Sequence, residues 1–235
     1  MSVRVRRITT TRAGGVSRAP FESFNLGDHV GDDPAAVAAN RNRLASSIGL
    51  PADHVVWMNQ VHGDHVEVVD APRSEPCDAT DALVTSTPGL ALAVVTADCV
   101  PVLLADARAG VVGAAHAGRV GAAEGVVLRT LESMLAAGAH AADITVVLGP
   151  AVSGPNYEVP EEMAADVEAC LPGSRTRTLS GTPALDLRAG IARQLLEAGV
   201  AAVEIDPRCT VADPAFFSHR RDAPTGRLAS LVWMQ

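Results

Sequence analysis

Three side chains offer nitrogen or sulfur donors close to the ends of apolar, strand-like runs: His62, Cys99 and His116. Cys99 lies 37 residues after His62, and His116 lies 17 residues after Cys99, so no local motif fixes them as one site. Two histidines and one cysteine would leave a fourth position open, which is the arrangement of catalytic rather than structural zinc. The alternative is that each is an ordinary core or turn residue.

The central stretch of the chain holds Cys99. The apolar runs Leu90–Val95 and Val102–Leu104 are typical of buried strands. Pro101 cannot donate to a strand ladder, so we expect the strand to bulge or end there. Asp98 and Cys99 would then lie where a buried strand breaks off. Asp98 could orient a metal-bound histidine or carry a proton, and a strand-end cap is the equal alternative.

The composition limits the chemistry. The net charge is −8 and no basic, aromatic-studded stretch occurs, which disfavours nucleic-acid binding. The chain has 19 arginines and no lysine, so Schiff-base chemistry and a P-loop lysine are excluded. Any anion must therefore be held by arginine, backbone N–H groups or a metal. No run of about 18 apolar residues predicts a membrane span, and the start lacks the apolar stretch of a signal peptide, so we expect a cytoplasmic protein.

Short strands alternate with a few helices, and several strands follow one another directly. We expect strands near 3–9, 55–58, 65–69, 81–85, 90–104, 110–115, 144–148, 203–205 and 227–233, and helices near 33–47, 121–137, 160–171 and 186–198. This order favours an α+β fold: one domain over residues 1–235, with mixed, sandwich-like β-sheets flanked by helices. Cys170, in a helical stretch, is expected to be a small core residue.

Four blocks of sequence resemble the YfiH family. They are Gln60-Val61-His62-Gly63, Thr96-Ala97-Asp98-Cys99-Val100-Pro101, Gly113-Ala114-Ala115-His116-Ala117-Gly118 and Phe217-Ser218-His219-Arg220-Arg221. They occur in the family's order, and the resemblance covers nearly the whole chain. Members carry the older label polyphenol oxidase or laccase-domain protein.

The resemblance implies a zinc-dependent purine nucleoside phosphorylase with adenosine deaminase activity. Its substrates would be phosphate and purine nucleosides such as adenosine, inosine and methylthioadenosine. The family's metal ligands correspond to His62, Cys99 and His116. The family block HAGWRG is replaced here by His116-Ala117-Gly118-Arg119-Val120-Gly121, and the family's tyrosine before the late arginine pair is His219. The tryptophan is therefore absent, and an arginine stands one place early.

Five further residues are candidates for binding substrate. Arg41 corresponds to a family arginine near the phosphate, although a solvated helix position is the commoner fate of such a residue. Asn25 resembles a family position near the active site, and a turn-forming asparagine accounts for it equally well. Arg220 could reach a phosphate, or belong to a surface pair with Arg221. Tyr157, the sole tyrosine, could stack on a base or close a loop. Arg119 is a third phosphate candidate because its displacement leaves its direction open.

Three rival functions remain at this point. A cysteine hydrolase or deamidase would use Cys99 as nucleophile and His116 as base, without metal. A copper-dependent polyphenol oxidase, the older label, is disfavoured because three dispersed ligands cannot hold several coppers. The open ligand set also disfavours a non-catalytic binding protein. The metal content of the purified protein separates the first rival from the zinc enzyme.

Overall fold

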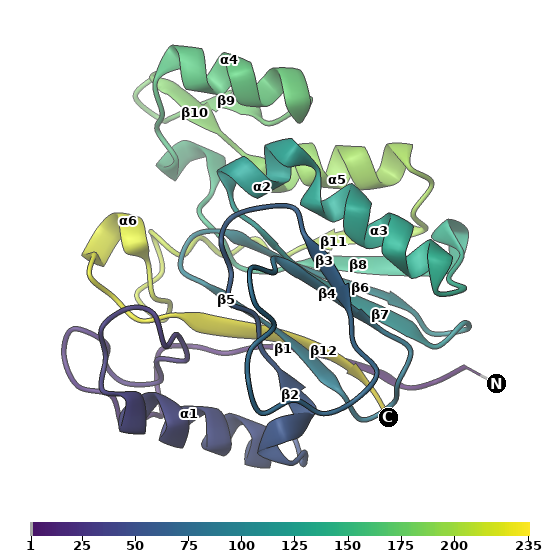
Figure 1. Cartoon of the computed structure of the whole chain (residues 1–235). Coiled ribbons are helices and arrows are strands. Elements are labelled where there is room, and N and C mark those ends of the chain that lie inside the picture. The colour runs from purple at the N-terminus through teal and green to yellow at the C-terminus, as the bar shows by residue number, and fades with distance from the viewer. Residues whose placement is uncertain (1) are drawn as a thin grey trace.

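The computed structural model describes residues 2–235 and contains two large β-sheets packed face to face (Figure 1). The first has six strands in the order β11-β8-β6-β7-β4-β3. Their bounds are Ala202–Ile205 (β11), Ile144–Leu148 (β8), Val100–Asp106 (β6), Val111–Ala117 (β7), Ala82–Thr85 (β4) and Val66–Val68 (β3). The second has four strands in the order β1-β12-β5-β2. Their bounds are Val5–Thr9 (β1), Leu228–Met234 (β12), Ala91–Thr96 (β5) and Val55–Val56 (β2). Both sheets mix parallel and antiparallel pairs.

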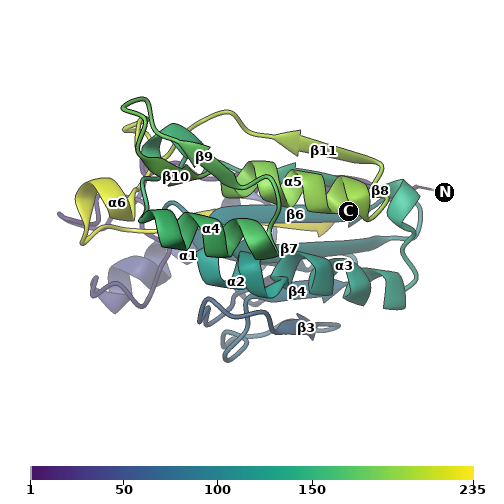
Figure 2. The same cartoon turned by 90° about the horizontal axis from the view of Figure 1, so that it is seen from above.

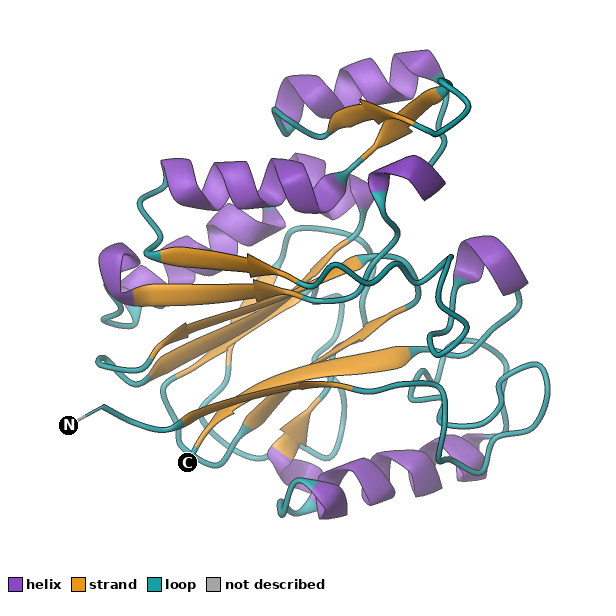
Figure 3. Ribbon diagram, turned by 180° about the vertical axis from the view of Figure 1, so that it is seen from behind, coloured by secondary structure: helices purple, strands orange, loops and turns teal. Residues whose placement is uncertain are grey.

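Helices cover the outer faces of both sheets. Helix α1 (Pro34–Ser47) lies on the four-stranded sheet, and α2 (Arg119–Glu124), α3 (Val126–Ala136) and α5 (Leu187–Glu197) lie on the six-stranded one (Figures 2 and 3). Beyond them, α4 (Glu161–Cys170) packs on a two-stranded ribbon of β9 (Arg175–Arg177) and β10 (Pro183–Leu185). A short helix, α6 (His219–Asp222), precedes β12. The expected α+β fold with mixed sheets flanked by helices is confirmed.

Among residues 2–235, three large apolar clusters and a small one around Phe216 and Phe217 form the core. Leu92, Leu103 and Val232 belong to the cluster between the two sheets, which draws on strands of both. A second cluster joins the six-stranded sheet to α2–α5, and a third joins the four-stranded sheet to α1. Each sheet is therefore apolar on both faces, which explains why its strands appear in the sequence as nearly continuous apolar runs. No helix among residues 2–235 is long and apolar enough to cross a membrane.

Helix α1 follows from its sequence. Pro34 occupies the first turn, and the side chain of the N-cap residue Asp33 accepts a hydrogen bond from the backbone N–H of Ala35. The helix expected over residues 121–137, in contrast, is two helices. Gly125 has a φ of 94°, which ends α2 and starts α3 in a new direction.

Three other expectations were wrong. The strand does not end or bulge at Pro101, because β6 begins at Val100. The Pro101 carbonyl accepts a hydrogen bond from the N–H of Gly149, just past the last residue of β8. The β6–β8 ladder ends at Val102 opposite Leu148, so the backbone N–H that proline lacks is not needed in it. His116 lies within β7, opposite Pro101, rather than after the strand. Cys170 is exposed at the end of α4 and is not a core residue. The strands β9 and β10 and helix α6 were not predicted, since each spans only three or four residues.

Candidate metal centre and active site

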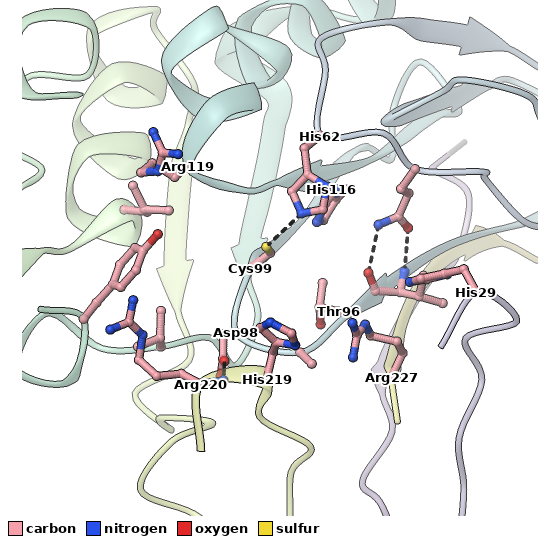
Figure 4. A pocket seen from close by; sticks show the side chains of 16 residues that line it. His29, His62, Thr96, Asp98, Cys99, His116, Arg119, His219, Arg220 and Arg227 are labelled. Carbon is pink, nitrogen blue, oxygen red and sulfur yellow. Dashed lines mark hydrogen bonds between the residues drawn. The ribbon is translucent and has the colours of Figure 1, made fainter. Parts of the chain in front are cut away.

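A cavity of about 560 Å³ opens where β5 ends and β6 begins (Figure 4). Side chains from both sheets, from two helices and from the chain around α6 line it. They are His29, Gln60, His62, Val95, Thr96, Ala97, Asp98, Cys99, His116, Arg119, Val152, Tyr157, Leu187, His219, Arg220 and Arg227. The break between the apolar runs therefore faces a cavity, as expected.

His62, Cys99 and His116 meet at one end of this cavity. Their donor atoms all lie within 4.8 Å of one another, and Cys99 Sγ is 3.9 Å from His62 Nε2. A tetrahedral zinc with ordinary bond lengths would hold such a nitrogen and sulfur about 3.6 Å apart. A Cβ added to Gly118 would lie 2.8 Å from His62 Cδ2 and 3.3 Å from Cys99 Sγ. Glycine is therefore required beside the cluster.

The carboxylate of Asp81 organises the donor cluster. Its Oδ1 accepts from His116 Nδ1 at 2.8 Å and from the backbone N–H of His62 at 3.0 Å. Its Oδ2 accepts from the backbone N–H groups of Val61 at 3.1 Å and Gly63 at 2.8 Å. Asp81 is fully buried, and His62 has a φ of 64°. The Asp81 carboxylate thus fixes the loop that carries His62. It also fixes the tautomer of His116, so that His116 Nε2 is left free on the side of Cys99.

Gln60 anchors the same loop to the sheet. Its Nε2 donates to the Val95 carbonyl at 2.9 Å, and its Oε1 accepts from the Val95 N–H at 2.8 Å (Figure 4). The side chain thus takes the place of a further strand at the end of β5. This pairing holds the His62 loop against the strand that leads to Cys99.

Cys99 and His116 form a charge-separated pair in the absence of metal. Burial raises the pKa of the Cys99 thiol, but the positive charge of His116 and hydrogen bonds from both histidines lower it to about 6. Burial lowers the pKa of His116, while the Cys99 thiolate and Asp81 raise it to about 9. The thiolate that a metal or an electrophile requires is therefore the favoured form near neutral pH.

Asp98 does not orient either histidine, in contrast to one expectation. Its carboxylate accepts from Thr210 Oγ1 at 2.5 Å and from the backbone N–H of Arg220 at 2.7 Å. Its φ is 92°, an unusual value for a residue with a side chain. The carboxylate thus ties the start of α6 to the cavity wall through Oδ2 and holds Thr210 through Oδ1, which is a positioning role. The orienting carboxylate is Asp81.

Three arginines line the cavity: Arg119, Arg220 and Arg227. Among residues 2–235, no carboxylate oxygen lies within 4.0 Å of a side-chain nitrogen of any of them. The Arg220 guanidinium lies over the Tyr157 ring, 4.8 Å from its centroid, and Nη1 donates to the Glu158 carbonyl. In a chain of net charge −8, these unpaired cations make the cavity suited to an anionic ligand.

The other two substrate candidates lie away from the cavity lining. Arg41 lines a separate surface hollow, where it pairs with Asp28 at 3.1 Å and covers the Trp57 ring at 4.2 Å. The structure thus does not bring Arg41 to the metal donors. Asn25 is fully buried and forms a turn, and its Oδ1 accepts from the N–H groups of Gly27 and Arg227. Its hydrogen bond with the backbone N–H of Arg227 links it to the cavity lining.

The altered block after His116 places Arg119 in the cavity lining and Val120 outside it. Val120 is 38% exposed. Tyr157 also lines the cavity, with the Arg220 guanidinium over its ring. Burial and the Cys99 thiolate raise the pKa of Tyr157, while both arginines work against that rise. The early arginine therefore faces the cavity on the same side as Arg220.

A second group of potential metal donors exists at Asp106, His140 and Asp143. Asp106 already accepts three backbone N–H bonds, and Asp143 accepts from Arg108 at 2.9 Å. These oxygens are used within the protein, so we assign no metal there.

The comparisons with known proteins bear on this site. A family model described as "Multi-copper polyphenol oxidoreductase laccase" matches residues 6–235. The chain belongs to this family. The expected resemblance to YfiH is confirmed, because the solved Bacillus licheniformis hypothetical protein YfiH superposes with a TM-score of 0.92 at 33% identity, over 98% of this chain and 93% of that one. A Neisseria meningitidis family member superposes at a TM-score of 0.89 and 37% identity, over 100% and 98% of the chains.

Relatives that are named for an enzymatic activity are more similar to this chain in sequence than these two solved structures are. A Mycobacterium tuberculosis (strain ATCC 25618 / H37Rv) protein named purine nucleoside phosphorylase is 72% identical over 235 residues, covering 100% of this chain and 94% of the relative. A Corynebacterium glutamicum protein of the same name is 58% identical over 232 residues, covering 98% and 94%. The names of these relatives support the conclusion that this YfiH-family chain is an enzyme.

Several residues of the site escaped sequence reasoning. Asp81 is a single aspartate before a strand, and Arg227 resembles an ordinary strand start. His29 was not singled out in the sequence, and it lines the cavity from an exposed loop. A signal existed for Asp81 alone, because a charged residue directly before the apolar run Ala82–Val84 needs buried partners.

Proposed function

We propose that this protein is a zinc-dependent purine nucleoside phosphorylase that also deaminates adenosine. One observation supports it most: a His, Cys and His donor cluster opens into the same cavity as three arginines without carboxylate partners. The first feature suits a metal with an open position, and the second suits phosphate. Relatives named purine nucleoside phosphorylase, up to 72% identical over the full chain, support the same reaction. Adenosine, inosine and methylthioadenosine are the proposed nucleosides.

The donor set fits zinc. His62, Cys99 and His116 would hold the ion, and the chain supplies the features that tetrahedral zinc needs: a thiolate, a fixed tautomer and a carboxylate behind one histidine. When bound, zinc would act as a Lewis acid toward the purine and lower the pKa of water for deamination. Asp81 keeps the proton of His116 on Nδ1, away from the cavity.

The cavity residues would serve the two substrates on different walls. In phosphorolysis, a phosphate oxygen bonds to the ribose C1′ and the C1′–N9 bond breaks, with its electron pair passing to the purine. Arginines would hold the phosphate as a dianion, because the chain has no lysine. Tyr157, carrying Arg220 on its ring, offers an aromatic wall for the nucleoside. Asp98 would keep Arg220 in place through the backbone of α6.

A second candidate is the metal-free cysteine hydrolase or deamidase. The lowered pKa of Cys99 beside His116 favours it, since this is the ion pair of a thiol nucleophile with its base. A blue-copper oxidase is less well supported, because none of the cavity-lining residues is the methionine that such sites use as axial ligand.

Metal analysis of three proteins tests the proposal: the parent, Cys99→Ala and, as matched control, Cys170→Ala at an exposed cysteine. We expect about one zinc per chain in the parent and the control. In Cys99→Ala we expect zinc and both activities to fall together. Stoichiometric zinc in Cys99→Ala would contradict the ligand assignment. A parent protein that contains no metal and still deaminates adenosine at the full rate would favour the cysteine hydrolase.

The activities are measured on the same preparations. Inosine should yield hypoxanthine and ribose 1-phosphate only when inorganic phosphate is present. Adenosine should yield inosine with or without phosphate. A parent that is loaded with zinc but releases no hypoxanthine at any phosphate concentration would refute phosphorolysis.

A further inference from the structure

We propose that Thr96 and Arg227 form the phosphate-binding subsite of this cavity, an assignment that rests on the proposed phosphorolysis. Neither residue stood out in the sequence. Both lie at the same end of the four-stranded sheet, because Leu228 of β12 pairs with Thr96 of β5. Figure 4 shows Thr96 between Cys99 and Arg227, with Arg119 and Arg220 on the opposite side of Cys99.

Thr96 presents a hydroxyl that the protein leaves without a partner. The residue is 2% exposed and lines the cavity, and its Oγ1 has no hydrogen bond to any of the described residues. A buried hydroxyl without a partner lowers the stability of a fold. A ligand oxygen in the cavity would supply the missing acceptor. The hydroxyl is therefore an independent sign of a polar ligand at this wall.

The Arg227 side chain is held in place by groups that use only part of its guanidinium. Its backbone N–H donates to Asn25 Oδ1 at 2.8 Å, and its stem packs on Gly27, where an added Cβ would lie 2.5 Å from Arg227 Cγ. Nη1 donates to the carbonyls of Thr225 at 3.0 Å and Gly226 at 3.1 Å. The hydrogen bonds among residues 2–235 leave Nε and Nη2 unused. A fixed, half-buried guanidinium with free donors is preorganised for an oxyanion.

Arg220 and Arg119 are less suited to this role. Arg220 is exposed, and its guanidinium lies over the Tyr157 ring. Its Nη1 donates a hydrogen bond to the Glu158 carbonyl. Arg119 lies on that same side of the cavity. This arrangement divides the cavity: an oxyanion binds beside Thr96 and Arg227, and the nucleoside binds toward Tyr157. Asn25, a predicted substrate residue, then acts as a positioning residue for Arg227.

Two variants test the subsite: Thr96→Val, which removes only the hydroxyl, and Arg227→Met, which keeps the stem. Arg193→Met is the matched control, at an exposed arginine of α5 that pairs with Glu197. Inosine phosphorolysis is measured against phosphate concentration, and adenosine deamination is measured on the same samples. We expect KM for phosphate to rise about tenfold in Thr96→Val and roughly a hundredfold in Arg227→Met. KM for inosine and the deamination rate should stay close to the parent values.

The stability of Thr96→Val adds a readout that a purely structural role would not give. Replacing an unpartnered buried hydroxyl by a methyl group should leave the thermal midpoint unchanged or raise it, while phosphate binding weakens. If Arg227→Met does not fold, Arg227→Lys replaces it, with the charge kept and the paired donors lost. A folded Thr96→Val with the parent KM for phosphate would overturn the subsite, as would equal losses in phosphorolysis and deamination.

Calorimetric titration with inorganic phosphate separates this subsite from the proposed function. Phosphate binding to the zinc-loaded parent that is lost in both variants supports the subsite even if no nucleoside is cleaved. Phosphorolysis by the parent with unchanged phosphate binding in both variants refutes the subsite and leaves the function intact.

Discussion

Replacing Asp81 by asparagine should weaken binding of the proposed zinc while leaving most of the fold in place. The Asp81 carboxylate accepts four hydrogen bonds, two on each oxygen. Asparagine keeps one oxygen, so in either orientation two N–H groups face an NH₂ group. If Oδ1 is replaced, these are His62 N–H and His116 Nδ1. If Oδ2 is replaced, they are the N–H groups of Val61 and Gly63.

The structure sets the size of the effect. A buried donor left without an acceptor costs about 1–3 kcal/mol, and the backbone donors here are part-buried, so two of them should lower the free energy of unfolding by at most about 2–6 kcal/mol. Loss of a carboxylate behind a histidine ligand typically weakens metal binding about 10–100-fold. His116 would also be free to carry its proton on Nε2, where it cannot bind metal.

The assay is zinc affinity by chelator competition, with thermal unfolding of the metal-free protein beside it. Asp106→Asn is a matched control, because Asp106 is also fully buried and accepts three backbone N–H bonds away from the cavity. Both variants should be destabilised, and only Asp81→Asn should lose zinc affinity. If Asp81→Asn binds zinc as tightly as Asp106→Asn does, Asp81 does not organise the donor cluster.

Three further outcomes are expected. Gly118→Ala should weaken zinc binding, because the added Cβ would lie 2.8 Å from His62 Cδ2. A normally folded variant that binds zinc as tightly as the parent would show that His62 can shift freely. Arg41→Met should leave KM for phosphate unchanged but lower the thermal midpoint, because Arg41 pairs with Asp28 and covers Trp57 outside the cavity; a raised KM would return the phosphate role to it. Burial raises the pKa of Asp106, but hydrogen bonds from the backbone N–H groups of Ala109, His140 and Arg108 lower it by more, so the pKa lies below that of a free aspartate. A carboxyl group whose pKa is lower in the folded protein than in the unfolded chain stabilises the fold at pH values above its unfolded pKa. The difference in the free energy of unfolding between the parent and Asp106→Asn should therefore be largest near pH 7 and shrink as the pH falls below about 4. A difference that does not change with pH would contradict this.

The donor cluster could be predicted because its members lie in recognisable sequence blocks. His62, Cys99 and His116 each follow or end an apolar run, and all three meet in the structure. Asp81 could not be assigned in the same way. It reaches His116 because β4 pairs antiparallel with β7, with Ala82 opposite Ala115, and that register is a product of tertiary packing.

The surroundings of two other residues, Arg41 and Arg227, also depend on tertiary contacts. Arg41 lies on a helix whose orientation is set by the contacts of Leu44 and Ala45 with the four-stranded sheet, and this orientation directs Arg41 to Trp57. Arg227 needs both the Asn25 turn and the pairing of β12 with β5 before it faces the cavity. Local patterns predicted most of the strands and helices and the three-residue donor cluster, whereas the walls of the cavity depend on contacts between distant segments.

The position of β12 also affects the order in which the protein can mature. β12 lies between β1 and β5, and its register runs from Met234 opposite Val5 to Ser230 opposite Thr9. During synthesis, the metal donors and most of the six-stranded sheet leave the ribosome long before this strand does. The chain could therefore collect its donors early, while Arg227 and the wall it forms wait for the last strand to insert. Such long-range closure is slow compared with local pairing, so a nascent chain would contain all three donor residues before its cavity is complete.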